Sequence, residues 1–141
     1  MAGEFSDTGG KRALDAVTGR ATVTLRTTYL ALLTAAPSDA TTDGTITVTE
    51  YAATGYARQT VAWTAPALNG SSIPESSNSG VLTFGPFTAG TGAVITHAAL
   101  VSAASGTTGD LLAWWSLDTS RTPAVNDSVS VAANALKLSV E

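Results

Sequence analysis

From Arg20 onward, β-branched residues occur in short runs that are separated by turn-forming residues. This spacing restricts the possible folds strongly, because antiparallel β-sandwiches and barrels produce it. We therefore predict a mainly β protein, an antiparallel β-sandwich of the jelly-roll or immunoglobulin-like type. About eight short strands are expected, at 28–34, 45–49, 55–63, 81–84, 94–102, 110–117, 129–131 and 136–140.

Some of these segments carry further information. Segment 28–34 is nearly all apolar, which predicts burial on both faces or at an interface. Segments 94–102 and 110–117 flank a Gly- and Thr-rich turn and predict a hairpin. Residues 66–80 contain Asn69-Gly70 and many serines, so we expect an exposed loop there.

The N-terminal residues predict one short α-helix. Ser6 or Asp7 can cap its start and Gly19 suits its end. Leu14 and Val17 lie three residues apart and form a small apolar face, which either docks into a groove on a partner or covers the protein's own sheet. With 141 residues, we expect a single domain, 1–141, in which 1–20 form the N-terminal arm and helix and 21–141 form the sandwich.

The composition favours assembly and argues against several partners. Charged residues make up only 13% of the chain, so small uncharged side chains must cover much of the surface. The net charge is −4 and no basic run is longer than Lys11-Arg12, so we expect no nucleic acid as a partner. No apolar stretch approaches membrane-spanning length and no signal peptide precedes the chain, so we expect synthesis in the cytoplasm and no membrane partner.

Recognisable catalytic patterns are absent from the sequence. There is no cysteine, and His97 stands alone in an apolar segment, where a structural role is the simpler interpretation. The carboxylates show no calcium-loop spacing, and no Gly-x-Ser-x-Gly or phosphate-loop pattern occurs. We therefore predict no catalytic residue, no metal site, no cofactor and no enzymatic activity.

The tryptophans leave one alternative open. Trp63, Trp114 and Trp115 could stack on sugar rings beside carboxylates, or they could pack in the core or at an interface. Because side chains alternate along a strand, Trp114 and Trp115 must point to opposite faces. At most one of these two can therefore face a ligand on a given side of the sheet.

A set of side chains is predicted to form contacts between molecules. One thin sandwich cannot bury every apolar strand on both sides, so a neighbouring copy or a larger assembly should cover part of this surface. Arg58 is expected to tie loops or subunits together through carboxylates or carbonyls. The candidate interface residues are Leu14, Val17, Tyr29, Leu30, Arg58, Leu112 and Trp114.

The order of several segments resembles a known family. The segments are YLALLTAAPSDATT (29–42), Glu50 followed by TGYARQTVAW (54–63), SNSGVLTFGPF (77–87) and VITHAALVSAASGTTGDLLAWWSL (94–117). Together they resemble small structural proteins of tailed bacteriophages, which are labelled tail-fibre-like, minor tail or head-decoration proteins.

The resemblance implies a non-enzymatic component of the virion. Its implied partners are other copies of the chain, as a homo-oligomer with a trimer as one option, and the phage major capsid protein or tail proteins. Our preferred expectation is a decoration protein of the head surface that stabilises the shell or forms a spike. The alternative is a tail-associated protein involved in host adsorption, with carbohydrate binding as an option.

Overall fold

The computed structural model describes residues 1–22, 24 and 26–140. In this part of the chain, α1 (Asp7–Thr18) is the single helix, and it follows the first of ten strands. The strands are β1 (Glu4–Phe5), β2 (Thr28–Leu33), β3 (Gln59–Val61), β4 (Ala67–Leu68), β5 (Pro74–Ser77), β6 (Leu82–Phe84), β7 (Ile95–Val101), β8 (Leu111–Arg121), β9 (Val129–Val131) and β10 (Lys137–Ser139).

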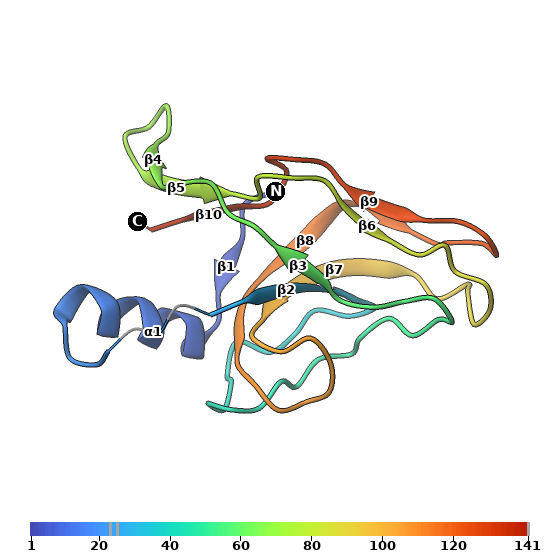
Figure 1. The fold of residues 1–141 in the computed structure, drawn as a ribbon, viewed down its shortest axis with the longest axis horizontal. Helices are drawn as coiled ribbons and strands as arrows, with labels where there is room; N and C mark the ends of the chain where they lie inside the picture. Colours follow the sequence, from blue (N-terminus) through green and yellow to red (C-terminus); the bar gives the residue numbers. More distant parts are fainter. Residues whose placement is uncertain (23, 25, 141) are drawn as a thin grey trace.

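The strands form two layers, as Figure 1 shows. One layer is a five-stranded sheet in the order β1-β8-β7-β2-β3. The other consists of the small sheets β10-β5-β4 and β6-β9. All the strand pairs within these sheets are antiparallel. The prediction of a mainly β, antiparallel, sandwich-like fold with a short N-terminal helix is confirmed.

The five-stranded sheet is buried on both faces at its centre. On the inner face, the main core includes Leu30, Trp115 and, from the opposite layer, Phe84. On the outer face, a smaller cluster includes Leu33 and Ile46, the latter from the connection between β2 and β3. This arrangement explains why β2 and β7 are nearly continuous apolar runs, since strands buried on both faces lack polar alternation.

Two segments differ from the predictions. Residues 45–49 form no strand; Ile46 inserts under the outer face of the sheet, where it is 2% exposed and its N–H donates to the carbonyl of Thr107 (2.7 Å). Residues 66–80 are not a featureless loop, because β4 and β5 pair around a turn at Asn69 and β5 also pairs with β10. Backbone hydrogen bonds hold this small sheet, so it needs few apolar side chains.

Helix α1 is attached to the sandwich by its first turn. Ser6 is the N-cap and its Oγ accepts from the Gly9 N–H (3.1 Å), while Gly19 ends the helix in the left-handed conformation at φ 65°. Thr8 and Gly9 are buried, but Leu14 is 66% and Val17 87% exposed. The helix therefore covers the sheet only at its start and projects from one end of the molecule (Figure 1).

The close approach of α1 to β8 yields a first prediction. A methyl group added at Gly9 would lie 1.8 Å from the Leu112 carbonyl oxygen, whereas one added at Gly10 would meet nothing within 4 Å. We expect Gly9→Ala to lower the free energy of unfolding by about 2 kcal/mol through overpacking. The matched control Gly10→Ala should raise it by up to about 1 kcal/mol through better helix propensity. Urea titrations followed by tryptophan fluorescence would measure both, and equal stabilities of the two variants would contradict this account.

Candidate functional site

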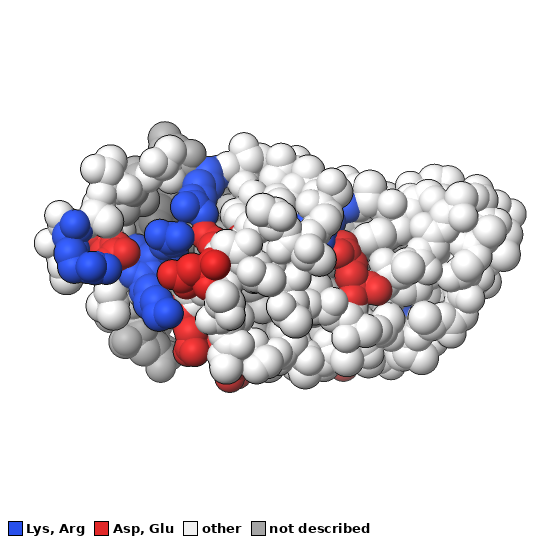
Figure 2. Space-filling view, turned by 90° about the horizontal axis from the view of Figure 1, so that it is seen from below, with Lys and Arg blue, Asp and Glu red and all other residues white. Residues whose placement is uncertain are grey.

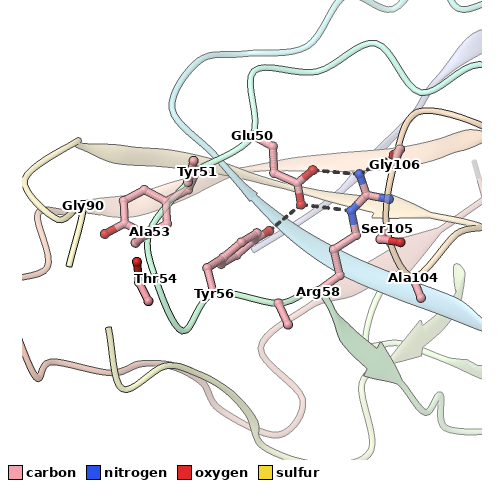
Figure 3. Close-up of a pocket in the computed structure, with 12 residues that line it drawn as sticks. Glu50, Tyr51, Ala53, Thr54, Tyr56, Arg58, Gly90, Ala104, Ser105 and Gly106 are labelled. Carbon is pink, nitrogen blue, oxygen red and sulfur yellow. Dashed lines mark hydrogen bonds and ion pairs between the residues drawn. The ribbon is translucent and has the colours of Figure 1, made fainter. Parts of the chain in front are cut away.

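A cluster of Glu50, Tyr56 and Arg58 lies beside a surface depression (Figure 3). The Arg58 guanidinium binds the Glu50 carboxylate with two nitrogens, Nε to Oε1 at 2.9 Å and Nη2 to Oε2 at 2.7 Å. The Tyr56 hydroxyl donates to Glu50 Oε1 (2.7 Å) and accepts from the Leu32 N–H (3.0 Å). This network joins the segment between β2 and β3 to β2 itself.

Arg58 also reaches the turn between β7 and β8. Its Nη1 donates to the Ala103 carbonyl (2.9 Å) and its Nη2 to the Gly106 carbonyl (2.8 Å). Since the Arg58 side chain is only 4% exposed, nearly all of its donors serve bonds inside the subunit. Arg58 was predicted to tie loops or subunits together through carboxylates or carbonyls. In the structure it joins loops of a single chain in this way.

Electrostatics fix the protonation states in the cluster. The hydrogen bond to Glu50 raises the pKa of Arg58, although burial opposes this shift. Burial, followed by the hydrogen bond to Glu50, raises the pKa of Tyr56 far above its usual range. At neutral pH the Arg58 guanidinium is therefore charged and the Tyr56 phenol is neutral, so neither of these side chains is an activated nucleophile.

The depression beside this cluster has a volume of about 670 Å³ and is open to solvent. Ala52, Ala57 and Ala104 supply part of its wall, and Tyr51 lies beneath it in contact with Tyr56 (ring centroids 5.8 Å apart). The Tyr51 hydroxyl is buried and has no hydrogen-bond partner in the described part of the chain. The depression thus offers mainly apolar surface beside a charge pair that is already satisfied.

A second polar cluster centres on Asp110, which precedes β8. Its side chain is 3% exposed; Oδ1 accepts from the Gly44 N–H (2.8 Å), and Oδ2 accepts from Arg12 of α1 (3.4 Å) and from Arg26 before β2. Burial alone would raise the pKa of Asp110, but the Gly44 N–H and the two arginines outweigh it and hold this pKa below its usual range. Asp110 therefore fastens the helix and two connecting segments to the sandwich.

Charges are unevenly distributed over the surface. Figure 2 shows that charged side chains gather at the end that carries α1, while most of the remaining face is uncharged. At that end Lys11 pairs with Asp43 (3.8 Å) and Arg20 pairs with Asp15 (2.6 Å). A surface of this kind has little charge repulsion to oppose contact with another protein.

Apart from Arg58, whose donors bind groups of the same chain, the predicted interface residues fall into three groups. Leu14 and Val17 are exposed and available for contact. Tyr29, Leu112 and Trp114 are half-buried, Tyr29 and Trp114 against the outer cluster and Leu112 against the main core. Leu30 is fully buried in the main core, so its assignment to an interface is wrong: the second layer of the same sandwich covers it.

The side chains considered for chemistry lie apart. His97 is half-buried, hydrogen-bonded through Nδ1 to Thr96 Oγ1 (2.8 Å), and its ring faces Trp114 at 5.6 Å. Among residues 1–22, 24 and 26–140, no group of three or more His, Asp or Glu side chains could hold a metal ion. Nor does any helix in this part of the chain have the length and apolar character needed to cross a membrane.

Comparison with known protein families identifies the chain's relatives. A family model described as Podophage GP4 fiber I protein gp80 matches residues 4–139. No curated protein matches the chain.

Proposed function

The chain belongs to the family of Podophage GP4 fiber I protein gp80, and from this premise we propose that it is a non-enzymatic, tail-associated fibre component that takes part in host adsorption. The family makes it a fibre-like structural protein of a phage virion. The match carries this proposal because it extends from β1 to β10 and so includes α1 and both layers of the sandwich.

The family description favours a fibre over the head decoration that we preferred from the sequence. A compact sandwich without repeats is a poor shaft, because fibre shafts are built from heptads or other repeated units. The fold supports a role as a joint or terminal unit of a fibre. Head decoration becomes the alternative outcome of the test below.

The polar clusters support a structural role. The polar atoms of three side chains, Glu50, Arg58 and Asp110, bind other segments of the same chain. These bonds stiffen long connections and leave few polar atoms free for a reaction. Lack of catalytic activity remains part of the proposal. A rigid, weakly charged particle is suited to repeated contacts within an assembly.

The exposed face of α1 is the attachment surface that we propose. Leu14 and Val17 lie on a helix that projects from the sandwich, and burying both would remove a substantial apolar area from water. The proposed partners are other copies of the chain and the fibre or tail proteins of the particle. Helix-in-groove contacts of this kind are a common mode of recognition.

Location on the particle tests the proposal. Particles that carry an epitope-tagged copy should bind gold-labelled antibody at the tail fibres. Leu14→Ser combined with Val17→Ser should leave the isolated protein folded but reduce its incorporation into particles, whereas Lys11→Ser on the same helix should not. Label confined to the capsid surface would replace the fibre assignment with head decoration, and normal incorporation of the double variant would exclude α1 as the attachment surface.

A further inference from the structure

The two adjacent tryptophans of β8 have different environments. Trp115 is fully buried in the main core, and its Nε1 donates to the Lys137 carbonyl (3.0 Å). Trp114 points to the outer face of the sheet, where it is half-buried. Its Nε1 donates to Asp39 Oδ1 (2.9 Å), a bond that fixes the orientation of the indole ring. The indole ring of Trp114 therefore lies at the outer surface of the sheet in an orientation fixed by Asp39.

Trp114 lines a groove of about 260 Å³ together with Met1, Ala2, Glu4, Ser116 and Asp118. The strand register brings these side chains together. Glu4 of β1 is paired directly with Trp114, so the two side chains lie on the same face of the sheet. Ser116 follows Trp114 by two residues along β8 and shares that face.

The polar groups of this groove are unengaged. In the described part of the chain, no hydrogen bond or ion pair involves the side chains of Glu4, Ser116 or Asp118. By contrast, Glu50 and Asp110 are fully occupied. The groove therefore holds two carboxylates and a hydroxyl that face solvent with free acceptor capacity, beside an aromatic ring.

A sugar ring matches this arrangement. One face of a pyranose carries C–H groups that pack on an aromatic ring, and its hydroxyls donate charge-assisted hydrogen bonds to carboxylates. Ligand sites in general combine apolar surface with a few convergent polar groups. No cationic side chain lines the groove, and the Met1 ammonium at its edge donates to the Ala135 carbonyl (2.9 Å). Two carboxylates against one ammonium leave the groove negative, so it disfavours anionic ligands.

We propose that the Trp114 groove binds a saccharide of the neutral or amino-sugar class and excludes acidic sugars. This inference rests on the proposed role in host adsorption and names the surface and the ligand class for it. Trp114 supplies the stacking surface, Glu4 and Asp118 accept from the sugar hydroxyls or ammonium group, and Asp39 acts as a positioning residue for the indole.

Tryptophan fluorescence of the isolated protein tests the ligand class. The probes are a tetrasaccharide of N-acetylglucosamine, a glucosamine oligomer and a tetragalacturonate. The first two should change the emission in a saturable manner, and tetragalacturonate should bind at least about tenfold more weakly. Glu4→Gln combined with Asp118→Asn should weaken binding of the first two by about tenfold or more, because both carboxylates are lost as acceptors.

Further variants show which tryptophan produces the change in fluorescence emission. Both Glu4 and Asp118 are exposed, so the double variant should keep the wild-type unfolding midpoint. Trp114→Phe should remove the emission change, and Trp63→Phe, which alters a ring stacked on Trp115 (6.4 Å), should retain it. No response to any saccharide, or a response that the Glu4 and Asp118 substitutions leave unchanged, would overturn the proposal.

A protein ligand is the competing occupant, since a basic side chain can also pack on an indole ring between carboxylates. Binding of oligolysine in place of saccharides, with the same dependence on Glu4 and Asp118, would overturn the saccharide assignment and mark the groove as a protein contact. The fibre assignment is tested separately: tail-localised label with no saccharide binding would refute this inference alone.

Discussion

Arg58→Ala should lower the free energy of unfolding by about 3 kcal/mol, the lower end of the range for removing one partner of a buried ion pair, because the Glu50 side chain is partly exposed. The substitution leaves the Glu50 carboxylate with only the Tyr56 hydroxyl, and it removes the donors to the carbonyls of Ala103 and Gly106. The Arg58 side chain is 4% exposed, whereas the Glu50 side chain is 25% exposed beside the open depression, so water can replace only part of the lost bonds. Urea unfolding followed by fluorescence and circular dichroism would measure the loss.

Three companion variants separate charge from shape. Arg121→Ala removes an exposed arginine with no ion pair in the described part of the chain and should change stability by less than about 0.5 kcal/mol. Arg58→Lys should remain well below wild type, because an ammonium cannot reproduce the two-nitrogen fork. Arg58→Met combined with Glu50→Gln should recover part of the loss, since no unpaired buried charge remains. If Arg58→Ala and Arg121→Ala were equally stable, the cluster would not fasten these loops.

The elements predicted well are those whose signals are local in sequence. Ser6 and Gly19 mark the ends of α1 because capping depends on residues a few positions apart. Alternation along a strand correctly placed Trp114 and Trp115 on opposite faces of β8. These inferences need only the periodicity of the backbone.

Features built from distant residues could not be predicted in the same way. An apolar strand such as β2 can be buried on both faces within one subunit or by contact between subunits. The sequence pattern is the same in both cases, so Leu30 was predicted at an interface although it lies in the core of one subunit. The pairing of β4 and β5 uses backbone groups, which leave no mark in side-chain composition. The 260 Å³ groove at Trp114 depends on the register of β1 with β8, although the conjunction of a tryptophan with nearby carboxylates was a usable signal.

The Asp110 cluster shows why the N-terminal helix was difficult to place. Its partners come from α1, from the segment before β2 and from Gly44, which are separated in sequence by up to 98 residues. A lone aspartate before a strand gives no indication of them. Because these segments meet at Asp110, its side chain adds a bond to Arg12 to the first-turn contacts that hold α1 against the sandwich.

Asp110→Ala should therefore lower the free energy of unfolding at neutral pH by about 2–3 kcal/mol. Most of this comes from the charge-assisted bond to the Gly44 N–H in a buried site. The arginine pairs contribute less, because the Arg12 and Arg26 side chains are 45% and 43% exposed and solvent screens them. Asp110→Asn, which keeps an acceptor for Gly44 but loses the charge, should lie between wild type and Asp110→Ala.

The pH dependence of this difference is the stricter test. Because the folded-state pKa of Asp110 lies below its ordinary value of about 4, the carboxylate stabilises the fold above that ordinary value, and the stabilisation is lost as pH falls through the folded-state pKa. The stability gap between wild type and Asp110→Ala should thus be constant from about pH 5 to 7 and shrink in more acidic solution. Subtracting the variant removes the contribution of other carboxylates, such as Glu75, whose pKa the hydrogen bond with Lys137 also lowers. A gap that stays unchanged down to about pH 2 would mean that Asp110 acts through packing rather than through its charge.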